Sequence, residues 1–379
     1  MGKQKCLRSI CAVLLAVCCA FSLAVSVFAA SDGMYEYEVV DGGAVITAYL
    51  GAGNTVVTLP SSLGGYPVIG VGDEAFGEVK NHVKPHAEVR QILFPSGITE
   101  FGDRAFAGTS WIDDPASADA DGFLTVNGVL IRYLGENTSV SVPSSVKSLA
   151  IGAFEQNETI REVSLPESIT ELPAYAFYKC TALRKVSLSG VLRNIGQSAF
   201  YGCTSLQGVY DPSGLFPDTL VTIADNAFYQ CSSLSGTLSL GSEMASLGTY
   251  AFAGCTAMTG IELPDTLYSI GSYAIGFSLE YRSGSYYPIQ NKEFVIHVTH
   301  EKADSEEAEQ RVLASYNKTA NPIYRYANDP DGTGYFDAFT LQWARLDYPF
   351  QMGDVNNDGK VTTADARLVL RCAVSLDDL

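Results

Sequence analysis

Short alternations of apolar and polar residues recur along the chain, and several of them end in a proline. Residues 160–166 read IREVSLP, with Val163 and Leu165 apolar between polar neighbours. This alternation predicts a short β-strand with one buried face, which Pro166 ends because proline has no N–H for a strand ladder. The same pattern predicts strands near residues 92–94, 140–142, 186–188 and 261–263.

A second apolar signal follows each strand, in which an alanine precedes a large apolar side chain. It recurs mostly at spacings in the twenties, which is typical of a leucine-rich-repeat solenoid whose units bury their apolar faces only by stacking. We therefore expect an α/β-type repeat solenoid, a curved slab of short parallel strands joined by turns and short helices. The pairs are Ala75-Phe76, Ala105-Phe106, Ala153-Phe154, Ala176-Phe177, Ala199-Phe200, Ala227-Phe228, Ala251-Phe252 and Ala274-Ile275.

Four cysteines share one phase of this repeat, each three residues after the phenylalanine: Cys180, Cys203, Cys231 and Cys255. Equivalent side chains of neighbouring parallel strands point the same way, whereas a disulfide needs its two Cβ atoms turned toward each other. The sequence therefore predicts buried, reduced thiols. Thr109 and Asn157 occupy the same position in two earlier repeats, so we expect this position to satisfy backbone groups of a turn.

The repeated phrase, roughly Leu-Pro, Ile-Gly, Ala-Phe, Cys and Leu, closely resembles the BspA-like leucine-rich-repeat family over about residues 34–280. The resemblance implies a secreted or surface protein that adheres to other proteins or cells. We assign residues 31–280 to the solenoid, with an insertion at 110–139. In that insertion Asn127-Gly128 separates two apolar runs, which predicts a β-hairpin with a primed turn. The acidic residues before it could hold calcium, but their spacing favours a solvated loop.

Two sets of side chains are candidates for ligand binding. The first set lies at outward positions of the predicted strands and consists of Arg161, Glu162, Arg184 and Lys185, a mixed face that could bind a protein or a glycan. The second set, Tyr178, Tyr201 and Tyr229, directly follows three repeat phenylalanines. These tyrosines either form an aromatic strip for sugar stacking or, as we favour, pack along the solenoid with their hydroxyls in water.

Beyond the last repeat, the pattern predicts a terminal cap over residues 281–326, since an open solenoid needs a polar end to stay soluble. Within this cap we expect a strand at 293–298, a helix at 301–316 and a returning strand at 322–326. Residues 327–350, which include DPDG at 329–332, are expected to form an irregular linker.

A second motif follows, with the sequence DVNNDGKVTTAD at residues 354–365. Oxygen ligands stand at positions one, three and five, glycine at six and an acid at twelve, which is the spacing of a calcium loop. Residues 364–373 are expected to continue as a helix. The segment at 351–379 resembles one calcium-binding half of a type I dockerin. That resemblance implies Ca²⁺ ligands at Asp354, Asn356, Asp358, Lys360 (main chain) and Asp365, and cohesin contacts at Thr363 and Ala364.

The N-terminus suggests export. Residues 1–30 combine basic residues, an apolar stretch and a small-residue exit, as in a secretory signal peptide, although the stretch is almost long enough to act as an uncleaved anchor. Removing it lowers the net charge from −18 to about −21, a field that disfavours nucleic acid as a partner. No later apolar run in the sequence is long enough for a membrane span.

Enzymatic chemistry has little support in the sequence, which contains four histidines and no nucleophile-elbow motif. The leading hypothesis is a secreted, non-catalytic protein whose solenoid binds a protein or glycan and whose tail docks, with Ca²⁺, into a cohesin scaffold of cellulosome type. One alternative is a cell-surface adhesin in which the calcium loop is purely structural. Another is an accessory or carrier of polysaccharide-degrading activity in residues 110–139 or 281–350.

Overall fold

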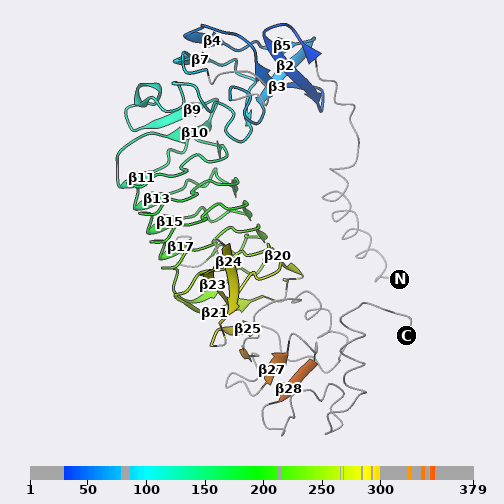
Figure 1. Ribbon diagram of the computed structural model, residues 1–379, viewed down its shortest axis with the longest axis vertical. Helices are drawn as coiled ribbons and strands as arrows, with labels where there is room; N and C mark the ends of the chain where they lie inside the picture. Colours follow the sequence, from blue (N-terminus) through cyan, green and yellow to red (C-terminus); the bar gives the residue numbers. More distant parts are fainter. Residues whose placement is uncertain are drawn as a thin grey trace, which may run out of the picture. The chain divides into compact units, whose positions relative to one another are not determined.

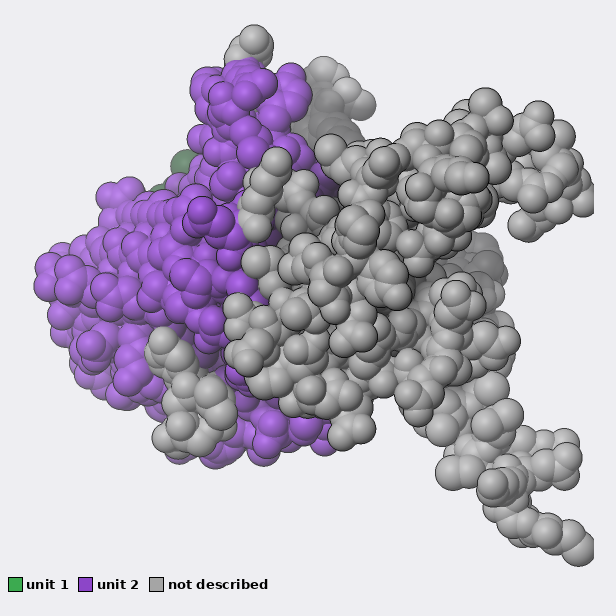
Figure 2. All heavy atoms as spheres, turned by 90° about the horizontal axis from the view of Figure 1, so that it is seen from below, with its two compact units in different colours: residues 1–117 green, residues 118–379 purple. Residues whose placement is uncertain are grey.

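The computed structural model describes most of the chain in two compact units, residues 1–117 and 118–379, coloured separately in Figure 2. The described residues are 30–77, 86–210, 216–264, 266–267, 269–282, 285–291 and 293–298, with strands at 323–325, 334–337 and 342–345. In this part of the chain no helix has the length and apolar character that a bilayer crossing requires.

Unit 1 combines an antiparallel start with the first parallel repeats. Strands β1 and β2 pair antiparallel, as do β2 and β3, and then β6 pairs parallel with β3 and with β8. A second parallel pair joins β4 and β7. Tyr49 stacks on Phe76 at 4.9 Å, and Phe76 contacts Phe106 at 5.5 Å between ring centroids. The elements are β1 (Ala30–Ser31), β2 (Tyr35–Val40), β3 (Gly43–Tyr49), β4 (Val56–Thr58), β5 (Ser62–Leu63), β6 (Tyr66–Val71), β7 (Gln91–Leu93), β8 (Glu100–Phe101) and the 3-10 helix η1 (Pro115–Ser117).

Unit 2 begins with the predicted hairpin. Strands β9 (Phe123–Val126) and β10 (Val129–Tyr133) pair antiparallel around Asn127 and Gly128, whose φ angles are +50° and +84°. Positive φ at both central residues is the requirement of a type I′ turn, so the primed turn is confirmed. The strand β12 (Ser148–Leu149) then pairs parallel with β10 and begins the regular repeats.

Each repeat contributes two short strands to two separate parallel ladders, visible as the stacked green layers in Figure 1. The first ladder keeps equivalent residues in register, so that Val140, Val163, Val186 and Val209 are successive partners with buried side chains. The second ladder has two-residue strands. The first comprises β11 (Ser139–Ser141), β13 (Glu162–Ser164), β15 (Lys185–Ser187) and β17 (Gly208–Tyr210), and the second β14 (Glu171–Leu172), β16 (Asn194–Ile195), β18 (Thr222–Ile223), β20 (Ser246–Leu247) and β22 (Ser269–Ile270).

The segments around the Ala-Phe pairs are turns, so the short helices expected from the sequence are wrong for the described repeats. The residue before each alanine has a positive φ, between +48° and +71°, and a left-handed residue interrupts a right-handed helix. Along each turn, some backbone N–H groups donate to the next repeat and others donate within the same turn. Tyr175, Phe177 and Lys179 donate to the following repeat, whereas Tyr178 and Cys180 donate to carbonyls three residues back. In this way the turns form their own ladder between repeats.

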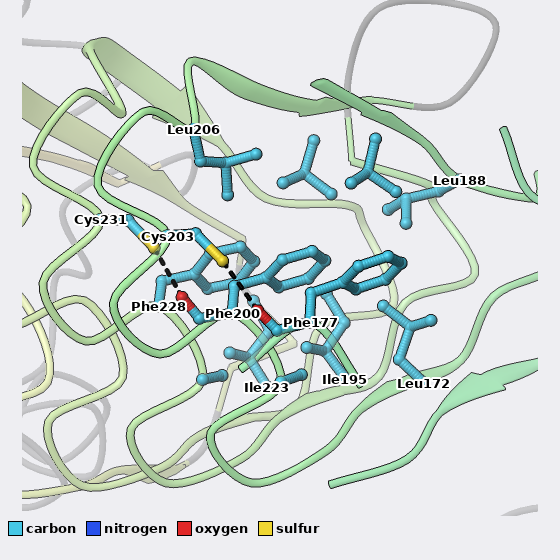
Figure 3. Packing of buried hydrophobic residues seen from close by; sticks show 14 of the residues in the cluster. Leu172, Phe177, Leu188, Ile195, Phe200, Cys203, Leu206, Ile223, Phe228 and Cys231 are labelled. Carbon is cyan, nitrogen blue, oxygen red and sulfur yellow. Dashed lines mark hydrogen bonds between the residues drawn. The ribbon is translucent and has the colours of Figure 1, made fainter. Parts of the chain in front are cut away.

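The core of unit 2 is a column of phenylalanine rings, one per repeat. Phe154, Phe177, Phe200, Phe228 and Phe252 are stacked at 4.9–5.1 Å, with interplanar angles of 1–12°. Figure 3 shows three of these rings lying parallel, with leucine side chains such as Leu188 and Leu206 on one side and Leu172, Ile195 and Ile223 of the second ladder on the other. The rings and the alanines before them are buried. The small side chain lets adjacent turns approach, and the aromatic ring fills the layer between them.

The four repeat cysteines form a second buried column, and all are free thiols, as predicted. Each thiol donates to the carbonyl of a phenylalanine one repeat earlier: Cys180 to Phe154, Cys203 to Phe177, Cys231 to Phe200 and Cys255 to Phe228, at 2.9–3.1 Å. Two of these contacts are drawn in Figure 3. In earlier repeats Thr109 donates to the Phe106 carbonyl, and the Asn157 side chain accepts from the N–H of Ile160. The expected role of this position in satisfying turn backbone is thereby confirmed.

The end of unit 2 adds a further sheet and a hairpin. The strands β19 (Gly236–Ser239), β21 (Met258–Leu263), β25 (Val295–Val298) and β26 (Ile323–Arg325) are parallel neighbours, which confirms the predicted strands near 293–298 and 322–326. The sheet continues antiparallel through β27 (Gly334–Asp337) and β28 (Gln342–Arg345), where we expected an irregular linker. The helix expected at 301–316 lies outside the described residues. The hairpin pairs β23 (Phe277–Arg282) with β24 (Ser285–Gln290).

Candidate functional site

The four predicted strand-face residues lie together on two adjacent strands of the first ladder. Glu162 of β13 is the register partner of Lys185 of β15, and the Arg184 N–H donates to the Arg161 carbonyl at 2.7 Å. All four side chains are exposed. Because their strands are short and held from below by the buried valines, these residues form a fixed patch with both signs of charge. We call Arg161, Glu162, Arg184 and Lys185 the strand-face patch.

The three predicted tyrosines form a stacked row. Tyr201 lies between Tyr178 and Tyr229, with centroid distances of 5.1 and 4.7 Å. Tyr250 contacts Tyr229 edge-on at 6.1 Å and stacks on Tyr273 at 5.1 Å. We call Tyr178, Tyr201, Tyr229, Tyr250 and Tyr273 the tyrosine row. Its two last members went unnoticed in the sequence because they precede their alanines, whereas the first three follow their phenylalanines.

The geometry of the tyrosine row favours packing over sugar stacking. A sugar ring stacks on the open face of an aromatic ring, and the faces of Tyr201 are turned to its two neighbours. All members of the row are half-buried. Burial, followed by the charges of neighbouring tyrosines, raises the pKa of Tyr229 to about 12 and raises the pKa of Tyr201. Tyr201 and Tyr229 therefore offer neutral hydroxyls and ring edges at physiological pH.

Exposed aromatic side chains concentrate instead on the β23–β24 hairpin. Tyr281, Tyr286 and Tyr287 are 63%, 50% and 50% exposed, and the rings of cross-strand partners Tyr281 and Tyr286 are 5.1 Å apart. The Tyr286 hydroxyl lies near enough to the tyrosine row to help raise the pKa of Tyr201 and Tyr229. This hairpin was not predicted from the sequence, although Arg282-Ser283-Gly284 between two aromatic-rich runs is a turn signal.

A pocket of about 450 Å³ lies at the base of this hairpin. It is lined by residues of the last repeat, by the start of β23, and by Asn291, Glu293 and Phe294 from between β24 and β25. Its lining residues are Phe252, Cys255, Thr256, Met258, Gly276, Phe277, Ser278, Asn291, Glu293 and Phe294. Pockets of this size are ordinary for small-ligand sites. Four of its ten lining residues carry polar side chains other than a thiol, so the pocket combines an apolar floor with a polar rim.

The predicted calcium loop and its partner contacts lie outside the described residues. This applies to Asp354, Asn356, Asp358, Lys360 and Asp365 and to Thr363 and Ala364. Among the described residues, no group of three or more His, Cys, Asp or Glu side chains is placed to hold a metal ion. In the acidic insertion, the side chains of Asp114 and Asp119 accept from nearby backbone N–H groups, as in a solvated, self-capped loop.

The two parallel ladders, the ring column and the turn ladder define a leucine-rich-repeat solenoid. Residues 132–216 and 212–279 match the family model described as "BspA type Leucine rich repeat region", in six copies. This match spans less than half of the chain, and the repeat region it covers has the leucine-rich-repeat fold. No curated protein matches the sequence significantly.

Solved repeat proteins are similar in part. A T. pallidum leucine-rich-repeat protein is 24% identical, with 63% of this chain and 92% of that chain covered and a TM-score of 0.32. A leucine-rich cell surface protein of Faecalibacterium prausnitzii is 19% identical over 80% and 95%, at 0.30. The pneumococcal vaccine antigen PcpA is 16% identical over 79% and 98%, at 0.31. At these TM-scores the fold assignment rests on the repeat geometry and the family match.

Proposed function

We propose that the protein is an exported, non-catalytic binding protein whose repeats recognise a protein or glycan surface. The observation that carries this proposal is the register of the first ladder, which places side chains of successive repeats side by side on a rigid, exposed face. Such a face provides many weak contacts in fixed positions, the usual basis of recognition by solenoids. The signal-peptide pattern of residues 1–30 supports export.

The strand-face patch is the part of this surface to test first. We expect the triple variant Arg161→Ser, Arg184→Ser and Lys185→Ser to lose binding on arrays of extracellular proteins and glycans. The residues are exposed, so the fold should persist. A matched control is Arg193→Ser, which should leave binding unchanged. Arg193 is an exposed arginine next to the second ladder, and its side chain forms an ion pair with Glu243 at 3.5 Å. Equal binding by wild type and triple variant would place recognition elsewhere on the repeats.

We further propose that residues 351–379 attach the protein, with Ca²⁺, to a cohesin-bearing scaffold. The support is the chemistry of the donor set: carboxylate and amide oxygens of Asp354, Asn356, Asp358 and Asp365 and the Lys360 carbonyl suit a hard cation. In this arrangement the cation would draw the loop together and fix the start of the following helix. Thr363 and Ala364 would then contact the cohesin.

A pull-down of the full chain with a panel of cohesins, with calcium and with chelator, tests this attachment. Binding that requires calcium and is lost in Asp354→Ala supports it. Retention of surface binding with no cohesin captured would favour the alternative function, a cell-surface adhesin in which the loop is only structural. Activity on plant cell-wall polymers would support the third reading, a role in polysaccharide degradation.

A further inference from the structure

The repeat pattern breaks at one defined position, where the chain leaves the solenoid. In four repeats the side chain three residues after the core ring is a cysteine that bonds one repeat back. In the next repeat Ile275 replaces the ring, and the position three residues later is Ser278. Ser278 lies in β23 and donates to the Ile289 carbonyl of β24 at 3.2 Å. The position six after the ring is Leu183, Leu206, Leu234 and Met258 in the same four repeats, all buried, and becomes Tyr281, which is 63% exposed.

The pocket at the hairpin base is therefore a vacated layer of the solenoid. The turn ladder continues as far as Phe277, whose carbonyl accepts from Gly254 at 2.8 Å, and the Asn291 N–H then closes the hairpin on the Gly276 carbonyl. Past this point no cysteine of a further repeat follows Cys255, while Met258 stays buried and lines the pocket together with Phe294. Consistently, Cys255 is 7% exposed, while the other three thiols are fully buried.

The lining of the pocket is divided by polarity. Phe252, Met258 and Phe294, each 2% exposed, pack beneath the pocket, and the half-exposed Phe277 presents an apolar ring to it. Thr256 and Glu293 are exposed, and Ser278 and Asn291 are half-exposed, so hydroxyl, amide and carboxylate groups surround the opening. Among the lining residues the sole ionisable group besides the Cys255 thiol is the Glu293 carboxylate.

We propose that this pocket binds one sugar ring of a neutral glycan. A pyranose has apolar C–H faces, which suit the half-exposed Phe277 ring, and a perimeter of hydroxyls, which suit the Thr256, Ser278, Asn291 and Glu293 groups. The carboxylate can accept from sugar hydroxyls, and its charge opposes acidic sugars and phosphates, as does the net charge of −18 on the chain. A purely apolar ligand would leave the polar rim without partners, which costs binding energy.

This inference rests on the proposed binding function and names its ligand class. The test is an array of neutral and acidic oligosaccharides probed with the full chain, followed by calorimetry with the soluble neutral oligosaccharide that binds best. We expect Glu293→Gln to weaken that affinity about tenfold, by loss of a charge-assisted hydrogen bond. Thr256→Trp, which adds bulk at the rim, should abolish binding. Both positions are exposed, so thermal unfolding midpoints should stay at the wild-type value.

A matched control is Glu171→Gln, which removes an exposed carboxylate from β14 and should leave the affinity unchanged. Equal binding of a neutral glycan by wild type, Glu293→Gln and Thr256→Trp would overturn the pocket assignment while preserving glycan recognition by the repeats. Binding to arrayed extracellular proteins with no neutral glycan bound would overturn the ligand class and leave the proposed function standing. A preference for acidic over neutral sugars would also overturn the assignment of a neutral glycan as the ligand.

Discussion

Single side chains set the spacing between repeats in this protein. A phenylalanine and a cysteine recur at fixed positions, and each contacts its equivalent or its backbone neighbour one layer away. A residue in the middle of such a column has a neighbour on both sides, so its loss leaves a void that the two flanking layers cannot close without moving. The cost of substitution should therefore depend on the position of a residue in the column as well as on its size.

Phe200 is the clearest case. Its ring is fully buried and stacked at 5.1 and 5.0 Å on the rings before and after it. We expect Phe200→Ala to lower the free energy of unfolding by about 3–5 kcal/mol, measured by urea denaturation. Val191→Ala, at a site that is 42% exposed, should change this free energy by less than about 0.5 kcal/mol. A mild effect at Phe200 would mean that the column repacks readily.

The thiols should be chemically inert in the folded protein. Burial raises the pKa of Cys180 to about 12 and raises the pKa of Cys203 and Cys231 well above the usual range. Since the thiolate is the reactive form, a disulfide reagent at pH 8 should label Cys180, Cys203, Cys231 and Cys255 only after denaturant is added. Rapid labelling of the native protein at these sites, located by peptide mapping, would contradict the buried column.

At the scale of elements, much of the architecture could be predicted from sequence, and what was missed has physical causes. The three-residue strands and the Asn127-Gly128 hairpin have patterns long enough to recognise. The second ladder has strands of two residues, such as Glu171–Leu172. Strands of this length show no alternation of apolar and polar residues from which they could be predicted. The turns were mistaken for short helices because several of their left-handed residues, such as Tyr175, Ser198 and Asn226, are not glycine. A glycine at these positions would have indicated a turn. The β23–β24 hairpin falls where the period stops.

Close approach of turns explains the glycine of the Ile-Gly phrase. A Cβ on Gly196 would lie 2.6 Å from the carbonyl carbon of Pro173 in the preceding repeat. We expect Gly196→Ala to destabilise by about 1–3 kcal/mol through overpacking. Gly190 is a control in the same repeat, because its Cβ would come no nearer than 3.9 Å, to the Glu167 carboxylate, and Gly190→Ala should be neutral or slightly stabilising. Thermal unfolding of the two variants side by side decides the comparison.

The tyrosine row should make the solenoid sensitive to alkali. Because the folded-state pKa of Tyr229 is raised from 10.0 to about 12, the neutral hydroxyl is favoured in the folded protein. Its contribution to stability is complete below about pH 10 and is lost as the pH rises toward 12. We expect Tyr229→Phe, which keeps the stacked ring, to lose less stability across this window than wild type. Tyr66→Phe, at an exposed site in unit 1, should follow the wild-type profile.

At the scale of the whole molecule, the core of the repeats in unit 2 runs along the stack, and each layer is stabilised by its two neighbours. Sequence therefore predicts the candidate surfaces unevenly. The strand-face patch could be predicted because it follows the period. The hairpin-base pocket could not, since it depends on Ser278 and Tyr281 leaving positions that cysteine and leucine hold in the earlier repeats.

The dockerin-like segment leads to a prediction about the response of the protein to calcium. If Asp354, Asn356, Asp358 and Asp365 bind calcium, the metal should order the loop and the helix expected at residues 364–373. We expect far-ultraviolet circular dichroism to gain helical signal between chelator and millimolar calcium. The Asp354→Ala variant should show no gain, and an unchanged wild-type spectrum would refute the calcium loop.

The turn ladder gives the stack a direction. From Gly152 to Gly254, turn N–H groups that cross between layers donate toward the later repeat, while the thiols donate toward the earlier one. In the turns, the first layer therefore presents carbonyls outward and the last presents amide hydrogens, so the two ends need chemically opposite terminators. If the two end segments were exchanged, or if a second copy were joined in the reverse direction, carbonyls would face carbonyls or N–H groups would face N–H groups, and no hydrogen bonds would form there. During ribosomal synthesis, by contrast, each newly made turn supplies the carbonyl acceptors for the N–H groups of the turn made before it.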